Sequence, residues 1–199
     1  MKRDFMEALK KRRSYYAISK EKVLSDEEMV SLVEDAVKYT PSAFNSQSAR
    51  TVVLFGREHD KLWDITMEIL RGIVPAKNFA STEEKINSFR GGYGTVLYFE
   101  DQSIVTGLQE QFPLYKDNFP IWSLQSSGML QLVIWTALES SGYGASLQHY
   151  NPLIDEKVAA GWNIPKSWKL LAQMPFGKPT ASPDEKTFLP LEDRVKIYR

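Results

Sequence analysis

The residues best suited to chemistry near the start of the chain are Arg12, Arg13 and Ser14. Two guanidiniums beside a hydroxyl match the hydrogen-bonding needs of a phosphate monoester, because each guanidinium presents several donors in a planar fork. The preceding Lys10 and Lys11 have a simpler explanation, since cations at the end of a helix offset the negative end of its dipole. Nucleic acid could use the same patch, but no aromatic platform motif accompanies it. We therefore expect a phosphate site at Arg12, Arg13 and Ser14.

A second group of polar residues is PSAFNSQSAR, residues 41–50, which leads directly into the apolar run TVVLF. Ser42, Asn45 and Gln47 carry hydroxyl and amide groups, and an amide can donate and accept hydrogen bonds at once. Such a segment is either a loop that satisfies its own backbone or a surface that binds the edge of a polar, planar ligand. The residue types alone leave both interpretations open.

Most familiar catalytic arrangements are missing from the sequence. The two histidines, His59 and His149, form no HExxH zinc motif, and no GxSxG elbow is present to hold a nucleophilic serine. The segment GYG at residues 142–144 begins like a dinucleotide fingerprint. It follows a predicted helix and leads into a predicted strand, however, which is the reverse of the order in a Rossmann site. Its simplest role is a helix C-cap. The absence of cysteine removes disulfides, thiolate metal sites and a cysteine nucleophile.

Length and composition indicate one globular domain spanning residues 1–199. The 25 basic and 25 acidic residues cancel, so no global field favours nucleic acid or a membrane surface. The N-terminal sequence MKRDFMEALKKRR lacks the apolar core of a signal peptide, and the apolar stretch around residues 129–138 is too short to span a bilayer. We expect a cytoplasmic protein with neither nucleic acid nor a membrane as a partner.

The elements that must position these residues follow from hydrophobic periodicity and helix caps. Capping boxes begin at Ser25 and Ser81, and Pro41 and Gly142 mark two helix ends. The predicted helices span residues 4–12, 25–40, 58–70, 81–90, 121–140 and 155–160, and the predicted strands span residues 51–55, 95–99, 144–148 and 168–174. This order predicts an α+β fold with a small sheet. A proline-rich C-terminal arm follows, which either lies on another subunit or frays.

Three motifs occur in an order that resembles the FMN-dependent nitroreductase family. They are RRS at residues 12–14, P-S-x-x-N-x-Q at residues 41–47, and G-x-G-A at residues 142–145 with a late G-x-P at residues 177–179. Their order and spacing along nearly the whole chain, rather than any single motif, carry the resemblance. The compact length, the segment LQHYNP and the ending LEDRVKIY are similar to a short branch of the family found in bacteria and fungi.

The resemblance implies a homodimer with a nitroreductase-like α+β fold. Its small, mostly antiparallel central sheet would be flanked by helices, with an extended C-terminal arm and FMN at the subunit interface. Arg12, Arg13 and Ser14 would hold the phosphate and ribityl end of FMN. Lys186 or Arg194 from the arm would complete the phosphate clamp, although relatives usually place two cations close together there.

Further residues are implied for the flavin ring and the ribityl chain. The polar residues, in this family often contributed by the partner subunit, would be Ser42, Asn45 and Gln47. The residues against the central ring near N5 would be Leu147, Gln148 and His149. The aromatic residues available to wall an acceptor site are Phe44, Tyr93, Phe112, Tyr115, Phe119 and Trp122.

FMN supplies its own redox chemistry, which accounts for the missing acid, base or nucleophile. The resemblance implies that NADH or NADPH delivers hydride to flavin N5 and that a nitroaromatic or quinone acceptor then enters the same cleft, in ping-pong order. The alternative is a flavin-binding redox or lipid-signal regulator with little turnover, because relatives in the short branch are associated with oxidative stress responses and fatty-acid signals.

Overall fold

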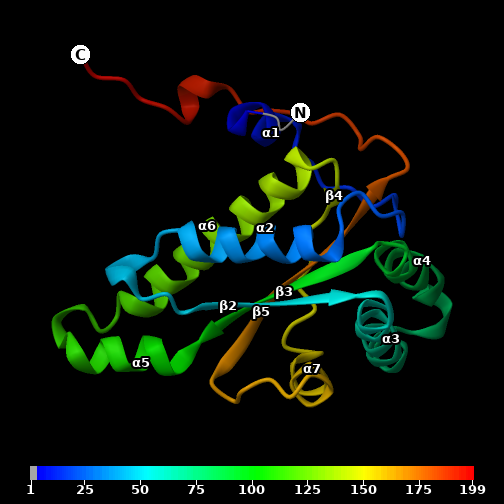
Figure 1. The fold of residues 1–199 in the computed structure, drawn as a ribbon, viewed down its shortest axis with the longest axis horizontal. Coiled ribbons are helices and arrows are strands. Elements are labelled where there is room, and N and C mark those ends of the chain that lie inside the picture. The colour runs from blue at the N-terminus through cyan, green and yellow to red at the C-terminus, as the bar shows by residue number, and fades with distance from the viewer. Residues whose placement is uncertain (1–3) are drawn as a thin grey trace.

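The computed structural model describes residues 4–199, which form a five-stranded sheet with helices on both faces (Figure 1). The strands are β1 (Ile18–Ser19), β2 (Ala49–Phe55), β3 (Gly94–Asp101), β4 (Gly144–Ala145) and β5 (Trp168–Pro179). Their order is β1-β5-β3-β2, β4 also pairs with β5, and every strand pair is antiparallel. The predicted α+β fold with a small antiparallel sheet is confirmed.

The helices form a layer on each face of the sheet (Figure 1). Their bounds are α1 (Phe5–Lys11), α2 (Asp26–Tyr39), α3 (Gly56–Ile73), α4 (Phe79–Arg90), α5 (Gln102–Gln111), α6 (Phe119–Ser140) and α7 (Asp155–Gly161). Helices α2 and α6 cover one face, whereas α3, α4 and α7 cover the other. Neither α6, at 22 residues the longest, nor any other described helix is long and apolar enough to cross a membrane.

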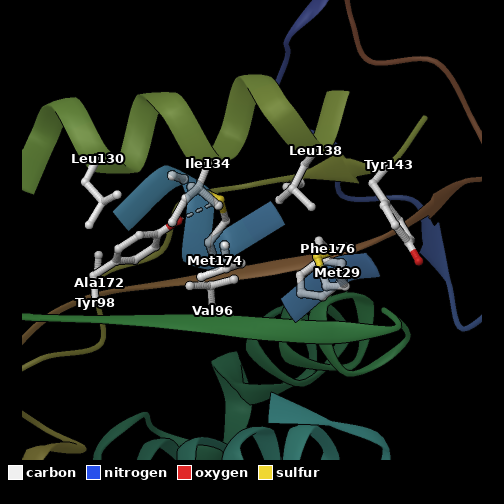
Figure 2. Packing of buried hydrophobic residues seen from close by; sticks show 13 residues of the cluster. Met29, Val96, Tyr98, Leu130, Ile134, Leu138, Tyr143, Ala172, Met174 and Phe176 are labelled. Carbon is white, nitrogen blue, oxygen red and sulfur yellow. Dashed lines mark hydrogen bonds between the residues drawn. The ribbon is translucent and has the colours of Figure 1, made fainter. Parts of the chain in front are cut away.

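The face under α6 is a tightly packed apolar layer (Figure 2). Leu130, Ile134 and Leu138 recur every four residues, so they share one side of the helix and point toward the sheet. Val96 and Tyr98 of β3 meet them, because alternate residues of a strand point to the same face. All five side chains are buried. This layer fixes α6 on the sheet, and both ends of α6 bear on the site described below.

The opposite face combines apolar packing with one buried histidine. Leu97 and Phe99 of β3 point into it, in alternation with the residues under α6. His59 of α3 lies there fully buried, with Nδ1 2.9 Å from the Thr95 hydroxyl and Nε2 3.2 Å from the carbonyl oxygen of Arg90. Burial lowers its pKa to about 4. This histidine is therefore a neutral structural group.

Besides shifts in the bounds of other elements, such as β4 ending at Ala145 rather than at residue 148, three elements differ for an identifiable reason. Helix α5 was not predicted because its sequence, QSIVTGLQEQ, is mostly polar; the Asp101 carboxylate caps it by accepting from the Ser103 N–H at 3.1 Å. Helix α4 begins at Phe79 rather than at the predicted capping box, since the Ser81 hydroxyl donates to the carbonyl of Asn78 instead. Strand β1 is a fifth strand where four were predicted, and its two residues are too few to leave a periodic signal.

Candidate functional site

Three cations from opposite ends of the sequence line one cavity of about 580 Å³. Arg12 and Arg13 follow α1, and Lys186 lies in the tail segment 181–187 that forms the other wall. The Arg13 guanidinium donates to the backbone oxygen of Asp184, which lies 171 positions later in the sequence. We call Arg12, Arg13 and Lys186 the cation cluster. Figure 1 shows the tail passing beside α1 before it leaves the body of the molecule.

Ser14 is held beside the cation cluster by the strand that follows α6. It forms an isolated parallel bridge with Ala145, and the N–H of Tyr15 donates to the Ala145 carbonyl at 3.0 Å. A Cβ at Gly144 would stand 2.7 Å from Cγ of Tyr15, so only glycine allows this close approach. The second glycine of the G-x-G-A motif therefore lets Ser14 pack against β4.

The first glycine of that motif ends α6. Gly142 has φ 93°, and its N–H donates to the carbonyl of Glu139, while the N–H of Tyr143 donates to the carbonyl of Leu138, both at 3.0 Å. These two bonds are those of a Schellman C-cap. The predicted C-cap is confirmed, and it turns the chain from α6 into β4.

Arg12 is an incompletely compensated cation. Its Cζ lies 4.4 Å from the ring centroid of Trp135, and its Nε is buried with no hydrogen-bond partner among residues 4–199. Burial, followed by the charge of Arg13, lowers the pKa of Arg12, and the nearby carboxylate of Glu139 offsets part of this. A bound anion would relieve both the desolvation and the repulsion between the two arginines. The cluster therefore has the donors of an anion site, and its three cations outnumber the two acidic residues that also line the cavity, Asp184 and Glu185.

Residues 147–149 run beside β5 but do not all face the same way. The N–H and carbonyl of Gln148 bond to Gln173 at 2.7 and 2.9 Å, and its buried side chain donates to the Ser146 hydroxyl at 3.1 Å. Backbone groups alternate in direction along an extended chain, so those of Leu147 and His149 face away from β5. Of the three residues expected near N5, Gln148 has its backbone groups bonded to β5, whereas the backbone groups of Leu147 and His149 face away from that strand. The Leu147 side chain packs against the core under α6, and His149 is exposed.

The segment 42–48, which we call the polar loop, satisfies much of its own backbone. The Ser42 hydroxyl accepts from the N–H of Gln47 at 2.9 Å, and the side-chain amide of Gln47 donates to the carbonyl of Asn45 at 3.4 Å. The side chains of Asn45 and Gln47 are nevertheless exposed. Phe44, Asn45 and Gln47 have φ of 56°, 51° and 49°, a left-handed conformation that costs energy for residues other than glycine. The backbone of the polar loop thus behaves as a loop that satisfies its own hydrogen bonds, whereas its exposed side chains could still bind a ligand.

Phe44 anchors this loop in a cluster of aromatic rings. Its ring centroid lies 5.1 to 6.0 Å from four others, those of Phe112, Tyr115, Phe119 and Trp122. Five of the six aromatic residues considered for an acceptor site therefore come together. The sixth, Tyr93, lies elsewhere, with its ring 6.1 Å from that of Tyr143.

The predicted site residues fall into two groups at different positions along α6. The Ala43 N–H donates to the Ser126 hydroxyl at 3.4 Å, whereas Arg12 lies over Trp135. Nine helical residues separate these contacts, which is about 14 Å along the helix axis. Within one chain the polar loop and the cation cluster are therefore separate. Arg194 is exposed and does not line the cavity that Lys186 shares with the two arginines in the described chain.

A set of charged residues next to the polar loop was not recognised from the sequence. Arg50 at the start of β2 pairs with Asp101 at the end of β3, with Nη2 3.2 Å from Oδ2. The adjacent Glu100 is fully buried, and neither carboxylate oxygen makes a hydrogen bond of good geometry among the described residues, although the nearby Ser48 hydroxyl partly stabilises the charged form. Burial raises the pKa of Glu100. The sequence did contain a signal for this set, because Arg50, Glu100 and Asp101 are charged residues within strands that are otherwise mostly apolar.

The model of the Nitroreductase family matches residues 9–178 of this chain. The chain belongs to the nitroreductase family. This confirms the resemblance drawn from the three motifs, and with it the class of oxidoreductases to which that family belongs.

Known relatives of this family member cover its whole length. It is 36% identical over 196 residues to HBN1 of Saccharomyces cerevisiae, a candidate nitroreductase, and the match covers 98% of this chain and 96% of the yeast protein. The nitroreductase CinD of Lactococcus lactis, solved with chloramphenicol, shares 45% identity and superposes with a TM-score of 0.90 over 98% of this chain and 100% of CinD. A nitroreductase with bound FMN from Desulfitobacterium hafniense shares the fold at 16% identity, with a TM-score of 0.71 and full coverage of both chains.

Proposed function

We propose that this nitroreductase-family protein is an FMN-dependent NAD(P)H oxidoreductase that reduces nitroaromatics or quinones in ping-pong order. The observation that carries the proposal is the cation cluster, where an incompletely compensated Arg12 and its neighbour Arg13 line a cavity beside Ser14 and Lys186. FMN, when bound, would accept hydride at N5 and pass electrons to the acceptor. No other redox group is needed from the chain.

The residues at the cavity fit the phosphate of FMN. Arg12 and Arg13 supply charge-assisted donors, and the hydroxyl of Ser14, fixed against β4, supplies a neutral one. Lys186 would close the cavity from the tail and would serve in place of Arg194, the other cation that we had considered. The outward-facing backbone of Leu147 and His149 would then lie along the ring, where a fixed N–H can stabilise developing negative charge.

The proposal includes a homodimer in which the polar loop of one subunit meets the cation cluster of the other. The separation of these two groups within one chain supports it, since neither alone surrounds a flavin. Large apolar side chains on α6 and the tail are also exposed, as expected of a surface that pairs with another copy. They are Ile121, Leu124, Met129, Leu132, Leu189 and Ile197.

The comparisons support the acceptor class and the cofactor. CinD has been solved with chloramphenicol and with 4-nitrophenol, both nitroaromatic compounds. The structure from Desulfitobacterium hafniense contains FMN. In our protein, the cluster around Phe44 would form an apolar wall for such a ring. The cytoplasmic location remains a prediction from the sequence.

The test is an absorption spectrum of the purified protein, followed by anaerobic addition of NADH or NADPH and then of 4-nitrophenol. We expect the absorption bands of oxidised flavin to disappear when NADH or NADPH is added and to return when 4-nitrophenol is added. A colourless protein that FMN does not stabilise against heat would contradict the proposal. A protein that holds FMN but shows negligible steady-state turnover would instead support the flavin-binding regulator considered above.

A further inference from the structure

We propose that Arg50 is a positioning residue that holds the polar loop in its left-handed shape and ties that loop to α5. The inference rests on the proposed function, because the ligand that the loop would meet is FMN. It goes beyond that function by assigning a role to a residue that belongs to none of the three motifs and that shares a cavity wall with Ser42 and Gln47.

The guanidinium of Arg50 binds three oxygens at once. Its Nη1 donates to the backbone carbonyl of Gln47 at 2.6 Å and to that of Ala49 at 3.0 Å, and its Nη2 donates to Asp101 at 3.2 Å. Its Cζ also lies 5.7 Å from the ring centroid of Trp168. The side chain is 28% exposed, so water competes only partly for these donors. The planar guanidinium reaches these acceptors from two separate nitrogens, a geometry that a single ammonium nitrogen does not reproduce.

These contacts fix Gln47, one of the three left-handed residues of the polar loop. Gln47 has φ 49°, a conformation that a non-glycine residue leaves readily unless its surroundings impose it. The Ser42 hydroxyl holds its N–H, and Arg50 holds its carbonyl, so both sides of the residue are anchored. The direction of the Gln47 side chain is therefore set before any ligand arrives. Without Arg50, a ligand would have to order this segment on binding, which lowers affinity.

Asp101 extends the same contact to α5. Its Oδ1 accepts from the N–H and the hydroxyl of Ser103 at 3.1 and 2.6 Å, while Oδ2 accepts from Arg50. Phe112, which follows α5, contacts Phe44 of the polar loop at 5.1 Å between ring centroids. The polar loop is thus held at one end by Arg50 and at the other by the ring cluster, with α5 connecting the two.

The first experiment measures the loop without any flavin. Hydrogen–deuterium exchange of the FMN-free R50M variant should show at least tenfold faster exchange in residues 42–50 than the wild type, a smaller increase in the first turn of α5, and no change elsewhere in the chain. The matched control is R71M, because Arg71 also makes an ion pair (2.8 Å to Glu83) and contacts a ring (5.1 Å to Phe79) but binds no loop carbonyl in the described contacts. R71M should leave exchange in residues 42–50 as in the wild type.

The second experiment measures FMN affinity by fluorescence quenching. We expect R50M to raise the dissociation constant roughly tenfold and R71M to leave it unchanged. The R50K variant keeps the charge beside Asp101 but cannot span three oxygens. It should therefore regain most of the unfolding free energy lost in R50M without regaining FMN affinity, a split that a purely structural role would not produce. It also replaces R50M in both experiments if R50M does not fold.

Each outcome decides a separate point. Wild-type exchange in residues 42–50 of R50M would overturn the role of Arg50, whatever the protein binds. Faster exchange with unchanged FMN affinity would overturn the link to the cofactor, as would an R50K variant that regains both properties. A wild-type protein that binds no FMN would refute the proposed function alone, because the exchange experiment still tests the contacts of Arg50.

Discussion

The two regions of the site lie along the same helix but are built in opposite ways. At the C-terminal end of α6, the cation cluster gathers charges that the described chain compensates only in part. At the N-terminal half, the polar loop is saturated with hydrogen bonds and ring contacts that hold a left-handed backbone. The first region would gain its favourable contacts from a ligand, whereas the second is shaped in advance. Substitutions in the first region should therefore remove ligand contacts directly, whereas those in the second should act on a ligand through the shape of the loop.

The largest effect should come from the double substitution of Arg12 and Arg13 by alanine. Losing two charge-assisted phosphate contacts should raise the FMN dissociation constant at least a hundredfold, about 3 kcal/mol, as measured by fluorescence titration. The control is the double variant Lys61→Ala with Arg71→Ala, which removes two charges from ion pairs elsewhere on the surface. Equal losses in both variants would show that net charge, not the cluster, determines affinity.

A change outside both regions should alter stability without altering the cofactor site. The folded protein holds the pKa of His59 near 4, below its ordinary value of 6.5, so the unfolded chain takes up the proton first as the pH falls. The free energy of unfolding should therefore decrease by about 3 kcal/mol between pH 6.5 and pH 4 from this group. Urea unfolding of the wild type and of His59→Gln over this range isolates the contribution, since carboxylates titrate in both proteins. Parallel pH profiles would exclude a neutral buried histidine.

Removing the ring of Phe44 should affect the polar loop more than the phosphate contacts. Phe44→Ala loses contacts with four rings, each worth about 0.5–1.5 kcal/mol when fully formed, but half of the side chain is exposed. We expect the KM for 4-nitrophenol to rise roughly tenfold, while FMN affinity changes only a few-fold. Leu114→Ala is the control, because that neighbouring side chain is 94% exposed. An unchanged KM in Phe44→Ala would show that the aromatic cluster does not contact the acceptor.

The smallest effect concerns the buried carboxyl group beside the polar loop. Burial raises the pKa of Glu100, so the unfolded chain ionises at a lower pH than the folded protein. The free energy of unfolding therefore falls as the pH rises from the ordinary pKa through the raised one. Glu100→Gln should increase the free energy of unfolding by about 1 kcal/mol at pH 8 and have little effect at pH 4, where Glu100 is neutral in both states. Denaturant titrations at the two pH values test this. A larger increase in the free energy of unfolding at pH 4 than at pH 8 would show that the pKa of Glu100 is lowered, not raised, in the folded protein.

The sequence predicted the cation cluster better than the polar loop, for a physical reason. Arg12, Arg13 and Ser14 are adjacent, so residue types alone indicate an anion site. The family resemblance offered Lys186 or Arg194 as a further cation, and the structure brings Lys186 to the same cavity. The shape of the polar loop depends on left-handed residues such as Gln47, which no local propensity favours. Its support by Arg50 requires β2 and β3 to be paired first.

The same distinction applies to the fold. Elements with a strong period, such as α6 and β3, were predicted to within two residues of their observed starts. Helix α5 was missed because its stability comes from a cap at Asp101 and from packing against α6 rather than from an apolar stripe. Strand β1 was missed because it exists only as the partner of β5.

The strand order has a consequence for how the protein folds. β5 is the last strand to be synthesised, yet it lies between β1 and β3 inside the sheet. The contact between Arg13 and Asp184 likewise joins residues 171 positions apart. Contacts of such long sequence separation form slowly, because the entropy of closing the intervening chain is lost before they can compensate for it. A ribosome-bound chain that stops before residue 168 would hold Arg12 and Arg13 without the opposite wall of their cavity, and its apolar layers would remain open to other nascent chains.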